Sequence, residues 1–193
     1  PRDIMNEDEI AALLLVPDTR TLRGYRDRTM LEVLYGTGLR IGELLGLDVV
    51  DANVTDGWLH IRDAKWGADR VVPMGRAACE YVGGYLTNMR PRLVRSATER
   101  ALFVGMDRRS RMSHGYVFRL VRRYVRRAGI EKAVSPHSFR HTCATHLLRG
   151  GADIRYVQAI LGHRSLATTE RYTKVEIGDL AAVHERCHPR ERL

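Results

Sequence analysis

The chain changes its character between Val49 and Met74. On both sides of this stretch, apolar residues recur at the spacing of amphipathic helices. Within it lie three short β-prone runs, VVDANV, WLHIRD and DRVVPM, which the turn signals TDG and KWGA separate. The sequence therefore predicts an α+β fold that is mainly α-helical, with a small three-stranded antiparallel sheet near its N-terminal third.

Capping residues mark the ends of the predicted helices. Asn6 opens the first helix with Glu9 as its capping-box partner, Gly36 and Gly38 end the second, and Ser113 and Asp153 open later ones. ALFV is expected to form a brief extended piece. The expected helical segments are NEDEIAALLL, about 23–35, RIGELLGL, GRAACEYVGGYLTNM, SHGYVFRLVRRYVRRAG, SPHSFRHTCATHLLRGG, DIRYVQAIL, SLATTERY and the region of GDLAAVHER.

Length and charge bound the function. A chain of 193 residues that is 44% hydrophobic suits a single globular domain over 1–193. Its net charge of +9 favours a polyanionic partner, and double-stranded DNA is the predicted one. No apolar run approaches the ~20 residues that span a bilayer, and PRDIMNEDEI does not resemble a signal peptide. A cytoplasmic protein with no membrane partner is expected.

The cysteines and histidines raise the question of a metal. The three cysteines, Cys79, Cys143 and Cys187, form no C-x-x-C pair and are expected to be reduced and structural. Zinc is the rival use of the histidines, because two groups have suitable spacing: His137 with His141, and His184 and His188 with Cys187. No H-E-x-x-H motif occurs, and the prediction is that the protein uses no metal and no other cofactor.

Two helix starts carry residues that suit a phosphate. His137 and Arg140 lie three apart in a first helical turn, where backbone N–H groups are unpaired and the helix dipole is positive. Arg40 follows a Gly-x-Gly break at the head of another helix, and its planar fork can hold two phosphate oxygens. Glu43, one turn on, is predicted to orient Arg40. The alternatives are a polar helix start and an ordinary surface ion pair.

A further candidate group lies near the C-terminus. LGHRS places His163 in a loop, and SLATTERYTKVE places Tyr172 between Arg171 and Lys174. A lone tyrosine is usually a packing residue. A phenol has an ordinary pKa near 10, so it becomes a nucleophile only where positive charges stabilise the phenolate.

Taken in order along the chain, these residues resemble the signature of the tyrosine recombinases, the family of phage integrases and Xer-type resolvases: Arg40, Lys65, His137, Arg140, His163 and Tyr172. GTGLRIGELLGL is similar to the first arginine box and KWGADRVVPM to the lysine hairpin. SPHSFRHTCATHLLRGGADIRYVQAILGH is similar to the His-x-x-Arg box with the third basic position, and SLATTERYTKV to the nucleophile segment. The resemblance runs from about Glu7 to the C-terminus and implies the fold of a tyrosine recombinase catalytic domain.

The resemblance implies a mechanism for cutting and rejoining DNA without ATP or metal. Tyr172 would attack the scissile phosphate, which forms a 3′-phosphotyrosyl link and frees a 5′-hydroxyl. Arg40 and Arg140 would neutralise the charge of the phosphorane, and His163 would donate a hydrogen bond to it.

Proton transfer is assigned to two other residues by the same resemblance. His137 would accept the proton of the nucleophile or assist, and Lys65 would protonate the departing 5′ oxygen. Many relatives carry a second basic residue three positions after this lysine, where this chain has Ala68. Its absence favours Lys65 as the general acid.

The helix FRLVRRYVRRAG offers a second basic surface. Its arginines are predicted to point outward and contact the DNA backbone, with a merely solvated face as the alternative. These residues are Arg119, Arg122, Arg123, Arg126 and Arg127.

The resemblance also implies an assembly. Relatives carry an N-terminal core-binding domain, which is expected to be absent from this chain, and the segment 178–193 is predicted either to dock into a neighbouring protomer or to fold back. A monomer without DNA and a tetrameric synaptic complex on DNA are expected. Two other functions remain open: a type IB topoisomerase-like relaxase, and a catalytically silent DNA-binding module.

Overall fold

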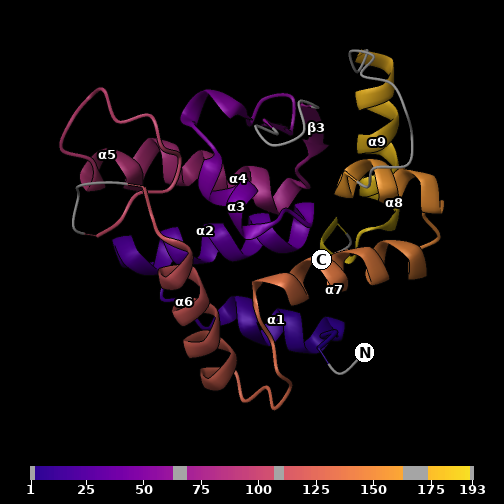
Figure 1. Cartoon of the computed structure of the whole chain (residues 1–193), viewed down its shortest axis with the longest axis horizontal. Coiled ribbons are helices and arrows are strands. Elements are labelled where there is room, and N and C mark those ends of the chain that lie inside the picture. The colour runs from indigo at the N-terminus through magenta and orange to yellow at the C-terminus, as the bar shows by residue number, and fades with distance from the viewer. Residues whose placement is uncertain (1–2, 63–68, 107–110, 163–173, 192–193) are drawn as a thin grey trace.

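The computed structural model describes residues 3–62, 69–106, 111–162 and 174–191 (Figure 1). In these ranges the predicted α+β fold is confirmed: helices form most of the molecule, and one small antiparallel sheet lies beside them. The predicted helix SLATTERY lies outside the described residues. The helices are α1 (Glu7–Leu15), α2 (Leu22–Thr37), α3 (Ile41–Gly46), α4 (Arg76–Gly84), α5 (Arg90–Leu93), α6 (His114–Arg127), α7 (Pro136–Arg149), α8 (Ile154–Leu161) and α9 (Lys174–Cys187).

The described sheet has the strand order β1 (Ala52–Asn53), β2 (Trp58–Ile61) and β3 (Arg70–Pro73), and both pairings are antiparallel. Leu59 pairs with Val72, and both are fully buried, so one face of the sheet packs on the core. The first strand is shorter than VVDANV suggests. Val49–Asp51 forms a 3-10 turn instead, because the Asp51 carboxylate accepts a hydrogen bond from the backbone N–H of Asp48 at 2.8 Å.

Helix α2 is the central element of the fold. It lies between α1 and α4 in Figure 1, and it contacts α1, α3, α4, α5 and α7. Its end differs in detail from the prediction: Gly36 is still helical, and Gly38 alone is the cap, with φ of 62°. Only glycine adopts this conformation readily, so Gly38 lets the chain turn directly into α3.

Several helices begin at the predicted caps. Asn6 and Glu9 exchange the two hydrogen bonds of a capping box at 2.7 and 2.8 Å. The side chain of Ser113 accepts from Tyr116 at the start of α6, and that of Asp153 accepts from Arg155 at the start of α8. The helix predicted from GRAACEYVGGYLTNM consists of α4 and a π-helical turn, Tyr85–Met89, that leads into α5.

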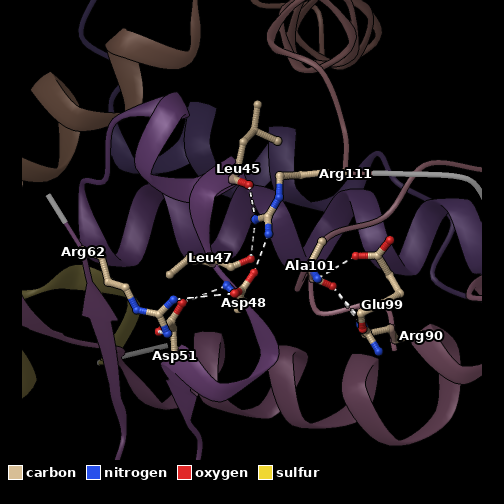
Figure 2. Close-up of polar contacts among 9 residues, drawn as sticks. All are labelled: Leu45, Leu47, Asp48, Asp51, Arg62, Arg90, Glu99, Ala101 and Arg111. Atoms are coloured by element: carbon tan, nitrogen blue, oxygen red, sulfur yellow. Dashed lines mark hydrogen bonds and ion pairs between the residues drawn. The ribbon is translucent and has the colours of Figure 1, made fainter. Parts of the chain in front are cut away.

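Arginines join the loops around the sheet to the end of α3, as Figure 2 shows. Arg111 donates to the carbonyl oxygens of Leu45 and Leu47 at 2.6 and 2.9 Å and forms an ion pair with Asp48. Arg62, directly after β2, pairs with Asp48 and Asp51. A cation at a helix C-terminus is favourable, so Arg111 helps to fix α3 at the end opposite to Arg40.

The segment after residue 178 packs on the domain itself. Leu180, Val183 and Cys187 of α9 are buried, and α9 contacts β3, α7 and α8. The short turn η3 (Pro189–Glu191) contacts α4. The exchange of this segment between protomers remains a prediction. Within the described ranges, no helix combines the length and the apolar character that a membrane span requires.

Candidate phosphate-binding site

The site is built first on the start of α3. Arg40 is the N-cap of this helix, and its side chain is 46% exposed. Glu43, one turn on, binds it twice: Oε1 accepts from Arg40 Nη1 at 3.0 Å, and Oε2 accepts from the Arg40 backbone N–H at 2.8 Å. The contact predicted between Arg40 and Glu43 is therefore present, and it leaves part of the guanidinium open to solvent.

A second arginine, which the sequence did not single out for the site, reaches the same carboxylate. Arg70 of β3 donates from Nη1 and Nη2 to the two oxygens of Glu43, both at 2.9 Å. Strand alternation was the signal that could have found it, because Arg70 shares the buried face of β3 with Val72 while Val71 points away.

Arg140 of α7 enters the site from the other side. Its side chain is buried and donates to the carbonyl oxygens of Gly38 at 2.9 Å and Leu161 at 2.6 Å. Burial, reinforced by the positive charges of Arg40 and Arg70, lowers the pKa of Arg140 to about 10. The guanidinium thus ties the turn before α3 to the end of α8.

The balance of charge in this cluster favours an anion. Among the described residues, Arg40 and Arg70 bind the carboxylate of Glu43, and the charges of all three act on Arg140. Burial alone would raise the pKa of Glu43, but the hydrogen bonds and charge of Arg70, and then of Arg40, hold it below its usual value. With Glu43 ionised, these four described residues carry a net charge of +2, and the exposed side of Arg40 is the place where a phosphate can reach it.

His137 lies on the surface at the start of α7. It is exposed, one turn before the buried Arg140, and its ring meets that of Phe118 of α6 edge-on at 6.4 Å. The two residues of the His-x-x-Arg pair therefore differ in exposure. His137 is accessible to a ligand, whereas Arg140 acts from below the surface.

Lys65, His163 and Tyr172 lie outside the described residues, but described residues that follow Lys65 and precede His163 lie at this cluster. Strand β2 ends at Ile61 and β3 begins at Arg70, on either side of Lys65. Helix α8 ends at Leu161, directly before the segment that carries His163 and Tyr172. The Nε–H of Arg70 donates to Ile160 O at 3.4 Å, so the hairpin and the end of α8 meet at the cluster.

The basic face of α6 divides into two kinds of arginine. Arg119, Arg122, Arg126 and Arg127 are exposed, as predicted. Arg123 is only 39% exposed, because its Nη2 pairs with Asp27 Oδ2 of α2 at 3.3 Å and its guanidinium lies over the ring of Tyr124. Arg123 is therefore part of the α2–α6 interface, while the others form an open cationic surface.

The histidines that raised the question of zinc have other partners. Nε2 of His184 lies 2.6 Å from Gly36 O, and that of His188 lies 3.3 Å from Tyr35 O. Nδ1 of His141 lies 3.2 Å from a carboxylate oxygen of Asp3. Among the residues that the structure describes, no group of His, Cys, Asp and Glu side chains has the geometry of a metal site.

The fold and this cluster define a member of the phage integrase family: the family's sequence profile matches residues 3–177, and the chain belongs to it. It is 41% identical over 188 residues to the tyrosine recombinase XerD of Staphylococcus epidermidis, with 97% of this chain and 63% of that protein covered. The chain thus spans less than two thirds of the length of this relative.

Solved structures agree with this family membership. The XerA recombinase superposes with a TM-score of 0.75 at 34% identity, over 94% of this chain and 63% of that one. The XerH recombinase bound to its difH substrate superposes with a TM-score of 0.72 at 23% identity, over 100% of this chain and 51% of that one, which shows a common fold.

Proposed function

We propose that this chain is the catalytic part of a site-specific DNA recombinase, which cleaves and rejoins strands through a 3′-phosphotyrosyl intermediate. The observation that carries the proposal is the cluster of Arg40, Arg70 and Arg140 around Glu43. The net positive charge of these described residues suits a phosphodiester that gains negative charge in the transition state. Sequence identity of 41% to a tyrosine recombinase supports the same chemistry.

The residue roles follow the order of events at the phosphate. Tyr172 attacks and becomes linked to the 3′ phosphate, and Lys65 protonates the 5′ oxygen as it departs. Arg40 and Arg140 hold the non-bridging oxygens, and His163 donates a further hydrogen bond. His137, exposed one turn from Arg140, accepts the phenolic proton. Rejoining reverses these transfers, and the energy of the broken bond is conserved in the protein–DNA link.

Double-stranded DNA is the proposed substrate, and further protomers are the proposed partners. The net charge of +9 and the open arginines of α6 supply a surface for phosphates. XerH, which shares the fold, is bound to its difH substrate in its structure. Strand exchange joins two duplexes, so several protomers must assemble on them.

The decisive experiment traps the covalent intermediate. The chain is incubated with a library of nicked duplexes at low ionic strength in the presence of a metal chelator. In these duplexes the short strand next to the nick dissociates after cleavage, so the strands cannot be rejoined. We expect a denaturant-resistant adduct that protease digestion reduces to a short peptide containing Tyr172. The Tyr172→Phe variant is the matched control and should form none.

Two results would contradict this proposal. One is the absence of any adduct with the unsubstituted chain, which would favour a silent DNA-binding module. The other is an adduct that persists in Tyr172→Phe. Adducts from the trapped library then supply the target sequence, and a two-duplex exchange assay with that sequence separates recombination from relaxation alone, the topoisomerase-like alternative.

A further inference from the structure

The carboxylate of Glu43 is shared between two arginines and fully occupied. Its two oxygens accept four hydrogen bonds, two from Arg40 and two from Arg70, at 2.8 to 3.0 Å. The side chain is 13% exposed, so these bonds are largely shielded from water. The position of Arg40 therefore depends on a carboxylate whose own position depends on Arg70.

Arg70 is itself enclosed. Its side chain is 7% exposed, and both of its Nη atoms bind Glu43. Besides Glu43, its Nε–H donates to the carbonyl oxygen of Ile160 at 3.4 Å. The guanidinium thus links β3, α3 and the end of α8.

The end of α8 is shaped around this side chain. Gly162 ends the helix with φ of 68°, and a Cβ at that position would come within 2.9 Å of the Cζ and Nε atoms of Arg70. A glycine is therefore needed at position 162 for two reasons: the positive φ of its backbone and the close approach of the Arg70 side chain. The segment that carries His163 and Tyr172 starts directly after this contact.

We propose that Arg70 is a positioning residue for DNA cleavage, one that acts on the phosphate through Glu43 and Arg40. This inference rests on the proposed function. Arg70 does not touch the phosphate: its fork faces Glu43, and the exposed guanidinium in the cluster is that of Arg40.

The chemistry of the side chain explains why an arginine is needed. Only a guanidinium presents two parallel N–H groups to a carboxylate together with a third N–H for a carbonyl. A lysine at position 70 can pair with Glu43 but cannot fix its orientation. A glutamine has a neutral amide in place of the cation, so Glu43 would be free to rotate with Arg40.

The test is a double-mutant cycle on the trapped cleavage reaction. Single-turnover rate constants are measured at saturating DNA for the unsubstituted chain, Arg70→Gln, Arg40→Ala and the double variant, with the sequence recovered from the library. We expect Arg70→Gln to lower the rate constant roughly 100-fold, because a misplaced reactive group costs about that much. In the Arg40→Ala background the same substitution should cost no more than about threefold, because residues that act as a unit are not additive.

A matched control separates positioning from stability. Arg28 of α2 is also buried and also binds one carboxylate, that of Glu32, and one carbonyl oxygen, that of Leu14. Arg28→Gln should lower the thermal unfolding midpoint but leave the cleavage rate of the folded protein unchanged in both backgrounds. Arg70→Lys, which keeps the charge, should lose rate by an intermediate factor and only when Arg40 is present; it carries the test if Arg70→Gln does not fold.

The outcomes distinguish this inference from the proposed function. Equal losses from Arg70→Gln with and without Arg40, or a loss in DNA affinity with an unchanged rate constant, would overturn the inference while the recombinase chemistry stands. If the unsubstituted chain forms no adduct, the proposed function and this inference both fall.

Discussion

Buried arginines in this protein differ in how their charge is neutralised. Arg26 binds Asp27, Arg28 binds Glu32 and Arg70 binds Glu43, so each has a carboxylate partner. Arg140 instead donates to two carbonyl oxygens, and no carboxylate is among its hydrogen-bond partners in the described ranges. A buried charge without a counter-ion is costly. Its presence here is accounted for if an anion completes the site.

The Arg26–Asp27 pair gives a stability prediction. Both side chains are fully buried, and Asp27 also accepts from Tyr124 at 2.8 Å and from Arg123. Asp27→Asn keeps the shape but leaves the Arg26 cation without its counter-charge, so the free energy of unfolding should fall by about 3 to 5 kcal/mol in urea titrations at neutral pH.

The control for Asp27→Asn is Asp18→Asn. Asp18 also pairs with an arginine, Arg20, but at the surface, where the Arg20 side chain is 88% exposed. Its replacement should leave the urea midpoint unchanged. Equal effects of the two substitutions would show that the buried pair contributes no more than a surface pair.

At the scale of elements, helix starts were the best-predicted feature. Asn6, Arg40, Ser113 and Asp153 all stand where the sequence placed them, because capping is a local interaction that the neighbouring residues decide. The contact of Glu43 with Arg40 was predicted for the same reason. The link from Glu43 to Arg70 spans 27 positions and was missed, because tertiary packing alone brings β3 to α3.

The same distinction explains the partial success for α6. Periodicity correctly separated its apolar face from its basic face. It could not show that Arg123 faces a buried aspartate of α2, since no local pattern marks Asp27 as buried. His184 and His188 were open to a zinc interpretation because spacing alone does not reveal carbonyl partners such as Gly36 O and Tyr35 O.

The division of the α6 arginines can be tested by salt dependence. When an exposed arginine binds a phosphate, counterions are released from the DNA. Removing both Arg122 and Arg126 should therefore make the negative slope of log K against log salt shallower by roughly 1.8. Arg123→Ala should leave that slope unchanged and lower the free energy of unfolding instead, because it loses the ion pair with Asp27.

Fluorescence anisotropy titrations of duplex DNA over a range of salt concentrations measure the slope, and urea titrations measure stability. Arg95, exposed and outside α6, offers a matched substitution, Arg95→Ala, for the change in net charge alone. If the change in slope per removed positive charge is the same in all the variants, Arg95→Ala included, α6 holds no specific phosphate contacts.

At the scale of the whole molecule, the C-terminal segment is held against α2 by buried histidines. The rings of His184 and His188 stack at 4.6 Å, and His188 also packs on Tyr35. Arg190 pairs with Glu32 at 2.8 Å, and Glu191 Oε2 accepts from the backbone N–H of Arg76. The turn η3 therefore joins α2 and α4.

This arrangement predicts a loss of stability in mild acid. Burial lowers the pKa of His184 and of His188, and the neighbouring charge of His184 lowers the pKa of His188 further. Of the facing groups, His146 and Arg190 also disfavour protonation of His188, while Glu191 favours that of His184. The unfolded chain therefore binds more protons than the folded one below the ordinary histidine pKa of about 6.5. Stability is full above that pH and falls as the pH drops through it.

Urea titrations at steps from pH 7.5 to 5.0 measure this effect, in a window that lies above the ordinary pKa of carboxylates, about 4. The free energy of unfolding should decrease across the window, and hydrogen exchange should show α9 opening before α2. His188→Gln, which cannot be protonated, should lose less stability between the two pH values, whereas His141→Gln, at an exposed histidine, should behave like the unsubstituted chain. If all three proteins lose stability equally, or α9 opens no earlier than α2, histidine burial does not hold the C-terminal segment in place.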